Sequence, residues 1–188
     1  MDLAITTERL TLRPLSLDDA EPFVRLMTPG IARWTGSWIG EETVERVVER
    51  LRRQIDLEAQ GLAVNRAATL SATGELMGWM SVHRAKAAPG RGALGYWIGE
   101  AWFAQGYTRE AVRALVPFAF EALDLQVIEA VAQTANAASI AVLRGLGMRY
   151  KGQREEFAVA RGTADLCEWF ELDRPWRQDT ALEEAEGW

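Results

Sequence analysis

A strand, a glycine-bearing turn and a long amphipathic helix follow one another in residues 96–123, which begin YWIGEAWFAQGYTREAVRAL. Aromatic and β-branched residues over Tyr96–Ile98 favour a strand, and apolar residues at helical spacing predict a helix over about 108–123. The predicted apolar face of this helix consists of Val112, Leu115, Val116, Ala119, Phe120 and Leu123. The first N–H groups of a helix have no partners inside it, so they can bind an anion. The sequence therefore predicts an anion site at the turn around Gly106.

Hydrophobic periodicity and turn residues divide the rest of the chain into further elements. Strands are predicted in ERLTLRPL (8–15), near 62–70 and 76–83, in GALGYWIG (92–99), in LQVIEAVA (125–132) and in a final hairpin over 148–172 that turns near Gly162. Helices are predicted from about Leu17, from Glu41 to about Leu57, and over 136–146. The segment PGIARWTGSWIG (29–40) is rich in Pro and Gly and is predicted to be a loop. We expect an α/β domain with a mixed, mostly antiparallel sheet.

Composition narrows the class of protein. The 188 residues, 48% of them hydrophobic, suffice for one core, so we expect a single domain over 1–173 and a polar C-terminal tail over 174–188. The net charge of -6 argues against a general nucleic-acid-binding surface. One cysteine, Cys167, and one histidine, His83, argue against an internal disulfide and a zinc site. With no apolar signal region and no stretch long enough to span a membrane, a cytoplasmic protein is expected.

The order of three segments is typical of one protein family. These are the strand, turn and helix of 95–123, the strand of 126–133, and the short helix that opens with an N-x-x-S motif at Asn136. In this order the sequence resembles the GCN5-related N-acetyltransferases (GNAT), especially the ribosomal-protein alanine acetyltransferase (RimJ/RimL-like) branch. The similarity runs from TTERLTLRPLSLDDAEPF to EWFEL and is strongest in GYWIGEAWFAQGYTREAVRALVPFAFEALDLQVIEAVAQTANAASIAVLRGLGMRYKG. It implies a GNAT fold, with two splayed central strands and about four flanking helices.

The resemblance also implies where the coenzyme binds. In this family acetyl-CoA lies in the V-shaped opening of the sheet, and the turn before the long helix binds its pyrophosphate through backbone N–H groups. The matching residues here are Trp102, Phe103, Ala104, Gln105, Gly106, Tyr107 and Thr108. Gly106 is expected because a Cβ would obstruct the approach of the phosphate. The anion predicted at the turn is thus the pyrophosphate of acetyl-CoA, the expected cosubstrate.

Two features of this region depart from the family pattern. The first position of the turn is usually Gln or Arg and is Phe103 here, while the last is usually Gly or Ala and is Thr108. Because backbone groups make most of the contacts, pyrophosphate binding is still expected. Pro117 lies inside the long helix, where it removes a hydrogen bond at a cost of about 3 kcal/mol. A kink is therefore expected about two turns beyond the phosphate turn.

The short helix over 136–146 is where the resemblance places the acid that protonates the departing thiolate. Many relatives carry a tyrosine there, but this chain has Leu143, which cannot donate a proton. Ser139 is the polar alternative, and a serine in this segment is typical of the RimL-like branch; its other role would be to cap or bond the backbone. Solvent and Tyr150 are further candidates. Asn136 resembles the family asparagine that contacts the pantetheine arm, and it is also an ordinary N-cap.

Several groups could act as the base that accepts the proton of the amine. Relatives often carry a glutamate just before the LGYW strand, where this chain has Ala93. His83 has an unperturbed pKa suited to proton transfer near neutral pH, although a lone histidine on a strand is more often structural or exposed. Glu155 and Glu156 in the final hairpin are further candidates, although charged hairpin residues are usually solvated. Water could also carry the proton.

Trp34 and Trp38 lie in the 29–40 segment, which in this family helps to wall the acceptor site. An aromatic wall suits an apolar or cationic acceptor, and the alternative role of both residues is core packing. The other tryptophans on strands or strand ends are predicted mostly to be core residues: Trp79, Trp97, Trp102 and Trp169. The acceptor-binding residues predicted from the sequence are therefore Trp34 and Trp38.

The function implied by the resemblance is transfer of an acetyl group from acetyl-CoA to a primary amine, although the sequence leaves other acyl groups open. The acceptor is either a protein N-terminal amine or a small-molecule amine. Many relatives form homodimers, and neither nucleic acid nor a membrane is expected as a partner. The alternative is a non-catalytic module that binds acyl-CoA as a sensor. Ala93 and Leu143 favour this alternative, whereas Ser139 opposes it.

Overall fold

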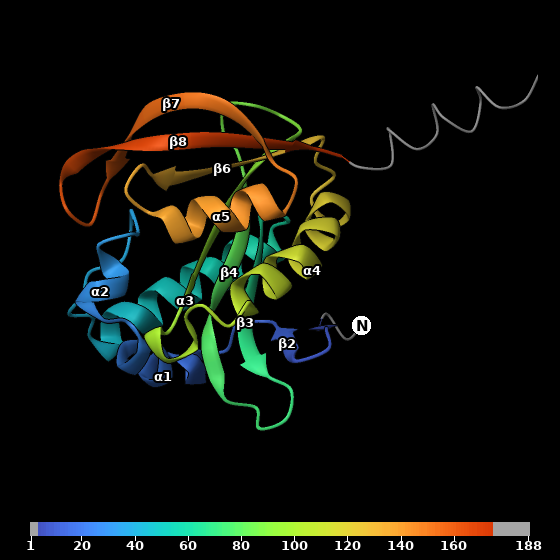
Figure 1. Cartoon of the computed structure of the whole chain (residues 1–188). Coiled ribbons are helices and arrows are strands. Elements are labelled where there is room, and N and C mark those ends of the chain that lie inside the picture. The colour runs from blue at the N-terminus through green and yellow to red at the C-terminus, as the bar shows by residue number, and fades with distance from the viewer. Residues whose placement is uncertain (1–3, 175–188) are drawn as a thin grey trace, which may run out of the picture.

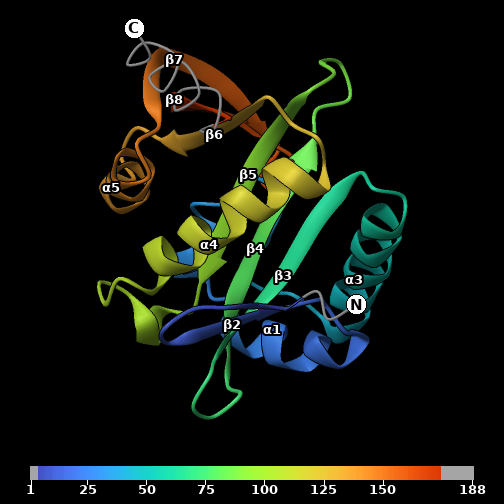
Figure 2. The same cartoon turned by 90° about the vertical axis from the view of Figure 1, so that its right-hand side faces the viewer.

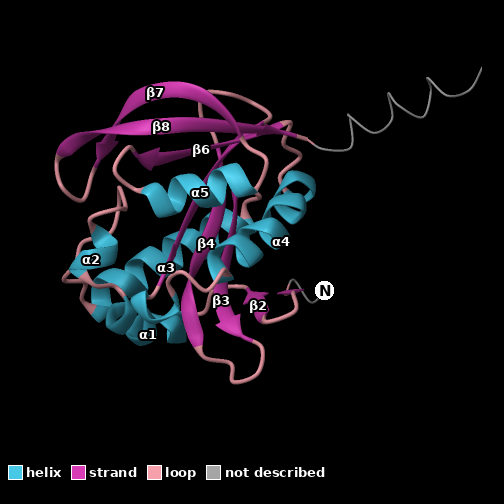
Figure 3. Ribbon diagram, in the orientation of Figure 1, coloured by secondary structure: helices cyan, strands magenta, loops and turns pink. Residues whose placement is uncertain are grey.

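The computed structural model describes residues 4–174, in which helices cover both faces of an eight-stranded sheet (Figure 1, Figure 3). The strands are β1 (Ile5–Thr6), β2 (Leu10–Arg13), β3 (Ala63–Leu70), β4 (Leu76–Arg84), β5 (Arg91–Ile98), β6 (Val127–Gln133), β7 (Arg149–Ala158) and β8 (Thr163–Asp173). The α-helices are α1 (Ala20–Leu26), α2 (Pro29–Ala32), α3 (Val44–Ala59), α4 (Tyr107–Ala122) and α5 (Ala137–Gly145). Among the helices of residues 4–174, none has the length and apolar composition needed to cross a membrane.

The prediction of a loop over 29–40 is wrong at its start, because Pro29–Ala32 forms α2. The side chain of Thr28 accepts a hydrogen bond from the N–H of Ile31 at 3.3 Å, and Pro29 occupies the first helical position. Thr as N-cap followed by Pro is a helix-start signal, which the Pro and Gly content of the segment obscured. The next helix, α3, also begins later than predicted, after its N-cap Thr43.

The sheet has the order β1-β2-β3-β4-β5-β6-β8-β7, and every neighbouring pair is antiparallel except β5 and β6. These two parallel strands pair only where residues 91–93 face residues 127–129. Beyond this short contact they separate. The predicted α/β class, the mostly antiparallel sheet and the splayed central strands are therefore confirmed.

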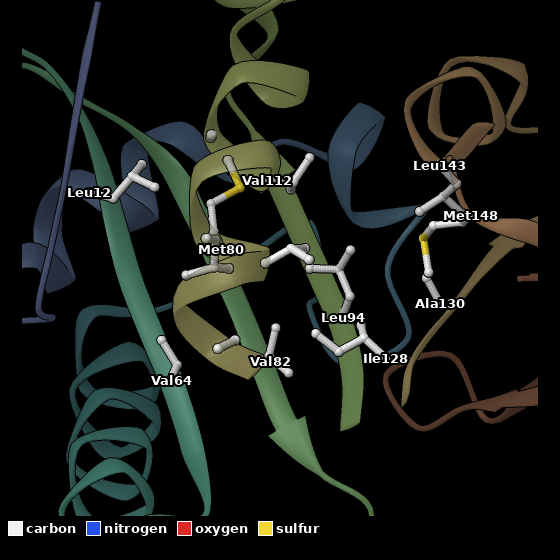
Figure 4. Packing of buried hydrophobic residues seen from close by; sticks show 14 of the residues in the cluster. Leu12, Val64, Met80, Val82, Leu94, Val112, Ile128, Ala130, Leu143 and Met148 are labelled. Atoms are coloured by element: carbon white, nitrogen blue, oxygen red, sulfur yellow. The ribbon is translucent and has the colours of Figure 1, made fainter. Parts of the chain in front are cut away.

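Two hydrophobic clusters cover the two faces of the sheet. Figure 2 shows α4 across one face and α1 and α3 beside the other. In the first cluster, Val112 of α4 lies beside Met80 of β4, with Val82 further along the same strand, while Leu143 of α5 lies near Met148 and Ala130 (Figure 4). The six apolar residues predicted on the long helix are all buried, which confirms its core-facing side. The second cluster joins α1 and α3 to β3, β4 and β5 through aromatic side chains.

The long helix α4 continues through Pro117 from Tyr107 to Ala122, so the predicted kink does not divide it. Pro117 is exposed, on the side of the helix away from the cluster. The N-terminal turns of α4, where the anion site is predicted, precede the proline. The single domain over 1–173 stays a prediction, and the predicted polar tail lies, from residue 175 onward, outside the described residues.

Candidate active site

The turn before α4 presents free backbone N–H groups. Gly106 is the N-cap of α4 with φ of +82°, and Ala104 also has a positive φ of +59°. The N–H of Glu110 donates to the carbonyl of Gly106 at 3.0 Å and closes the first helical turn. The N–H groups of residues 107–109 precede this bond and have no acceptor inside the helix. An anion placed before α4 would face these donors and the positive end of the helix dipole.

The structure gives a further reason for Gly106 beside the expected one, which concerns the bound phosphate and stays a prediction. A Cβ at this position would lie 3.6 Å from Nη2 of Arg9, which is an ordinary contact, so nothing else in the described chain excludes a side chain. The positive φ is the constraint, because L-residues with a Cβ adopt it only under strain. Glycine is therefore required by the shape of the turn.

Arg9, in the connection between β1 and β2, holds this turn in place through its side chain. Arg9 donates from Nη1 to the carbonyl of Gln105 at 3.1 Å and from Nε to Glu110 at 2.7 Å, and its guanidinium lies 4.2 Å from the ring centre of Tyr107. Burial alone would raise the pKa of Glu110, but hydrogen bonds from Thr7 and Arg9 outweigh it and lower the pKa. The carboxylate thus stays charged and ties the start of α4 to the N-terminal strands.

A cavity of about 950 Å³ begins at this turn and extends to both faces of the sheet. It passes between β5 and β6 where they separate, since Leu94–Ile98 and Val131–Gln133 both line it. Most of the residues predicted for the site line this cavity: Trp34, Trp38, His83, Trp102, Phe103, Ala104, Gly106, Tyr107, Thr108, Asn136 and Ser139. Gln105 instead lines a neighbouring cleft of about 520 Å³ with Arg9 and Arg113.

On the face covered by α4 and α5, two hydroxyl groups meet. Oγ of Ser139 lies 2.9 Å from the hydroxyl of Tyr96, which also donates to the carbonyl of Ser139 at 3.3 Å. Asn136 is the N-cap of α5, and its side chain accepts the N–H of Ser139 at 3.1 Å, as predicted for an ordinary cap. Burial raises the pKa of Tyr96 to about 12. The tyrosine is therefore neutral near pH 7 and able to donate a proton.

The other predicted acid and base candidates occupy different surroundings. Leu143 is fully buried in the first cluster, while Tyr150 is 52% exposed and does not line the cavity. Glu155 is exposed outside the cavity, whereas Glu156 lines it and forms an ion pair with Arg154 at 2.5 Å. Ser139 is therefore the predicted acid whose hydroxyl lies at the cavity.

His83 reaches the cavity from the opposite face of the sheet. Alternate residues of a strand share a face, so His83 of β4 lies on the same side as Ser81 and Trp79, while Met80 lies with its partner Tyr96 on the other side. Burial lowers the pKa of His83, which keeps the imidazole neutral near pH 7. The structure thus places the acid candidate and the base candidate on opposite faces of one open sheet.

An aromatic cluster forms the floor of the cavity on the His83 side. Trp38 packs edge-on against Trp79 and Trp97, with ring centres 5.5 and 5.1 Å away, and Phe23 contacts all three rings. Trp38 is therefore both a core residue and part of the cavity wall. Trp79 and Trp97 are buried as predicted, but Trp102 and Trp169 are only half-buried. Trp34 is also half-buried, with the guanidinium of Arg33 4.4 Å from its ring centre.

On the His83 side, one wall of the cavity consists of loop 32–37 and the end of the β7–β8 hairpin, residues 156–165. We call this wall the rim. The N–H of Ala160 donates to Gly36 at 3.0 Å, and Arg161 donates to the carbonyls of Ala32, at 3.2 Å, and Thr35. Arg161 also forms an ion pair with Asp165. These contacts make the rim a continuous wall, whose hairpin end lies beside α2 in Figure 1.

Many cavity residues were not identified from the sequence, among them the polar residues Arg50, Gln54, Tyr96, Arg161 and Asp165. Tyr96 was interpreted only as a strand residue. Arg50 and Gln54 are one helical turn apart, and a polar pair beside the apolar stripe of α3 is the signal that could have indicated them. Arg161 and Asp165 flank a hairpin turn, and no local pattern distinguishes them from solvated charges.

The arrangement can bind an anion at one end and exchange protons on both sides of the sheet. The N–H groups before α4 supply the anion site, the Ser139–Tyr96 pair supplies neutral hydroxyls, and His83 supplies a neutral imidazole. Cys167 also lines the cavity, but burial raises the pKa of its thiol to about 11, so it is a poor nucleophile near pH 7.

Comparison with known proteins agrees with the family resemblance. The model of the acetyltransferase (GNAT) domain family matches residues 9–149. Protein p20 of Bacillus licheniformis, named an uncharacterised N-acetyltransferase, is 27% identical over 157 residues, which cover 83% of this chain and 88% of p20. YdaF of Bacillus subtilis (strain 168), named as a candidate ribosomal N-acetyltransferase, is 28% identical over 178 residues, covering 90% of this chain and 94% of YdaF.

Solved structures share the fold. The structure of a candidate ribosomal-protein-serine acetyltransferase from Vibrio cholerae superposes with a TM-score of 0.76 at 24% identity. The superposition covers 92% of this chain and 98% of the Vibrio protein. At this level of identity the likeness supports the fold, and the residues of the site are argued from this chain alone.

Proposed function

The chain belongs to the acetyltransferase (GNAT) domain family, and we propose that the amine it acetylates is the α-amine of a protein N-terminus. The protein is an N-acetyltransferase that moves an acetyl group from acetyl-CoA, its cosubstrate, to an amine. YdaF, which matches most of the chain, is named for ribosomal proteins, and this supports a protein acceptor.

The residues at the turn fit the coenzyme. The N–H groups of 107–109 lack acceptors inside α4, and the pyrophosphate of acetyl-CoA would supply them. Trp102, Phe103 and Ala104 line the same end of the cavity, and Gln105 contributes its backbone to the turn. Asn136 would hold the start of α5 against the pantetheine arm. When bound, acetyl-CoA supplies a thioester whose carbonyl carbon is open to attack by an amine.

Ser139 is proposed to protonate the thiolate as it leaves. Its hydroxyl lines the cavity on the coenzyme face, and Tyr96 holds it at 2.9 Å, so its position is fixed by a second neutral hydroxyl. His83, neutral on the opposite face, is proposed to take the proton of the acceptor amine. This division suits a reaction in which the amine and the coenzyme approach from the two sides of the open sheet.

The observation that carries the acceptor proposal is the rim. We call the part of the cavity on the His83 side of the sheet the acceptor half. Because loop 32–37 and the hairpin end are hydrogen-bonded to each other, the rim closes one side of this half. An amine at the end of a chain can enter such a space, whereas an amine in the middle of a folded surface is harder to bring in. The same role would place the protein in the cytoplasm, where proteins are made. A homodimer and the absence of nucleic-acid and membrane partners stay predictions.

The test is acetylation of matched peptides by the purified full chain. Each peptide has a free N-terminus and one internal lysine, and its control has the same sequence with the α-amine blocked. We expect release of the coenzyme thiol only with the free N-terminus, and mass spectrometry should locate the acetyl group on the α-amine. Acetylation of lysine, or of small amines alone, would contradict the proposal.

A further inference from the structure

Two polar residues of α3 line the acceptor half of the cavity: Arg50 and Gln54. The guanidinium of Arg50 lies over the ring of Trp38, 4.2 Å from its centre, and donates to the carbonyl of Ser37 at 2.7 Å. These contacts hold a flexible side chain against the aromatic floor. Arg50 is thus a positioned cation beside the place where the acceptor amine must enter.

The charges around the acceptor half leave Arg50 only partly neutralised. Its carboxylate neighbour, Glu42, is 3.6 Å away and is shared with Arg46 at 3.4 Å, while also accepting the N–H of Ile39. On the opposite wall each carboxylate already pairs with a cation, Asp165 with Arg161, and Glu156 with Arg154, which also pairs with Glu129. His83, which faces the same space, is neutral near pH 7. The acceptor half therefore offers a positive charge to whatever enters it.

Three polar atoms in this half are buried and have no hydrogen-bond partner among the described residues: Nε of Arg50, Oε1 of Gln54 and Nε1 of Trp97. Trp97 is only 7% exposed, and it lines the cavity with the other two. By contrast, its neighbour Trp79 donates its Nε1 to Asn65. Buried donors and acceptors are normally paired, but these three atoms have almost no accessible surface, so a ligand in the cavity does not contact them directly in this conformation.

We propose that Arg50 forms a subsite for a carboxylate carried by the acceptor, with the positioned guanidinium as the donor. The preferred acceptor is then a protein N-terminus that has an acidic side chain within its first few residues. This inference rests on the proposed function, which it extends by naming the acceptor's charge.

Matched tetrapeptide amides test the subsite. Ala-Asp-Ala-Ala and Ala-Ala-Asp-Ala are compared with counterparts in which asparagine replaces the aspartate, so shape is kept and charge is removed. We expect kcat/KM to be about 10- to 100-fold higher for at least one acidic peptide, as for a charge-assisted hydrogen bond. Arg50→Gln should abolish this preference, so that the acidic peptides react no faster than their neutral counterparts. Equal rates for all four peptides with the wild-type chain would overturn the subsite.

The control variant is Arg53→Gln, which removes the same charge from the exposed side of the same helix. It should keep the preference, and loss of the preference in both variants would mean that general electrostatic attraction is responsible. If Arg50→Gln melts at a much lower temperature, Arg50→Lys, which keeps the charge, should retain part of the preference. A full loss of the preference in a folded Arg50→Lys variant, or an unchanged preference in folded Arg50→Gln, contradicts the proposal.

Binding separates this inference from the proposed function. If no peptide is acetylated, the proposed function fails, but the subsite is still measured with the product-like probe N-acetyl-Ala-Asp-Ala-Ala amide. Trp38 and Trp97 lie at the subsite, so we expect saturable quenching of tryptophan fluorescence by this probe and weaker quenching by its asparagine counterpart. Equal affinity for the two probes would overturn the subsite independently of catalysis.

Discussion

The two halves of the cavity are built in different ways. The coenzyme half consists mainly of one continuous segment, β5, the turn and α4, and the binding groups that we propose there are backbone N–H groups. The acceptor half joins α3, loop 32–37 and the β7–β8 hairpin through side chains, and its bond from Arg161 to Ala32 connects residues 129 positions apart. The first half therefore depends on backbone shape, and the second on which side chains meet.

This difference suits the two ligands. Coenzyme A is the same molecule for every member of a family, so a site made of backbone groups can tolerate substitutions such as Phe103 and Thr108. Acceptors differ, and the side chains of the acceptor half, Arg50 and Trp97 among them, are free to vary with the acceptor. Substitutions in the two halves should accordingly change different kinetic quantities.

The largest effect is expected in the coenzyme half, from Ser139→Ala. Loss of a positioned acid typically lowers turnover by about 10²–10⁴-fold while coenzyme affinity is largely kept. The cap from Asn136 involves the backbone N–H of residue 139, so α5 should stay folded. The measurement is kcat together with coenzyme affinity by titration. Ser81→Ala is the control, because this hydroxyl lines the same cavity from the acceptor face.

A fall in turnover of less than a few-fold would make Ser139 a helix residue only. A parallel fall in turnover and coenzyme affinity would make it a coenzyme contact. In both cases the proton for the thiolate would come from another group.

Leu115→Ala and Leu51→Ala remove matched, fully buried side chains from the clusters below the two halves. Each should lower the free energy of unfolding by about 2–5 kcal/mol, because a cavity replaces the side chain. Leu51 neighbours Arg50 on α3, so we expect Leu51→Ala also to raise KM for the amine, and Leu115→Ala to leave it nearly unchanged. Chemical denaturation and steady-state kinetics measure the two effects. A negligible change in unfolding would mean that the core was assigned wrongly.

Gly106→Val tests the backbone of the coenzyme half. The variant must hold a β-branched residue at φ of +82°, so we expect strain, a displaced turn and about 10- to 100-fold weaker coenzyme binding. Gly74→Val is the matched control, since Gly74 has φ of +74° and no neighbouring atoms within 4 Å. The control should lose stability but bind the coenzyme normally. Unchanged affinity in a folded Gly106→Val protein would remove the proposed pyrophosphate site.

The contrast between the halves also explains what the sequence could predict. The turn, α4 and the α5 cap are local patterns, so the sequence indicated Gly106 and the cap at Asn136 from the residues themselves, whereas Ser139 was singled out through the resemblance to the family. Hydrophobic periodicity likewise predicted the strands and the buried face of α4, because a helix buries one face whatever it contacts. The splayed sheet required the resemblance to a family, since strand pairing is not a local property.

Long-range contacts account for what the sequence did not predict. The ion pair of Arg161 and its bonds to loop 32–37 depend on a hairpin folding back over α2, and no spacing in the sequence records this. Arg50 was one of several charged residues on α3 until the sheet placed it beside Trp38. Tyr96 fitted a strand pattern equally well whether or not it touched Ser139. Side-chain pairs between distant segments therefore had to come from the structure.

His83→Gln tests the acceptor half through pH. Burial lowers the pKa of His83, so the wild-type imidazole should stay neutral somewhat below pH 6.5, and the acid limb of kcat/KM should lie below that value. The variant should lose this acid limb, and its kcat/KM at pH 7 should be about tenfold lower than that of the wild type. His83 binds a proton more readily in the unfolded state than in the folded state. The free energy of unfolding of the wild type should therefore fall as the pH drops below about 6.5, and it should fall less in the variant. An unchanged pH profile would leave water as the base.

The smallest effect is expected from Tyr96→Phe, which asks whether the coenzyme half needs one hydroxyl or two. The substitution removes the bond of 2.9 Å to Ser139 and keeps the ring that packs on the first cluster. A neutral hydrogen bond contributes about 0.5–1.5 kcal/mol, so we expect kcat to fall by about 2- to 10-fold with coenzyme affinity unchanged. In the Ser139→Ala background the same change should cost less, because the tyrosine then has no serine hydroxyl to position. A fall in the single variant as large as that of Ser139→Ala would instead make Tyr96 the proton donor, since its pKa of about 12 keeps the proton available at neutral pH.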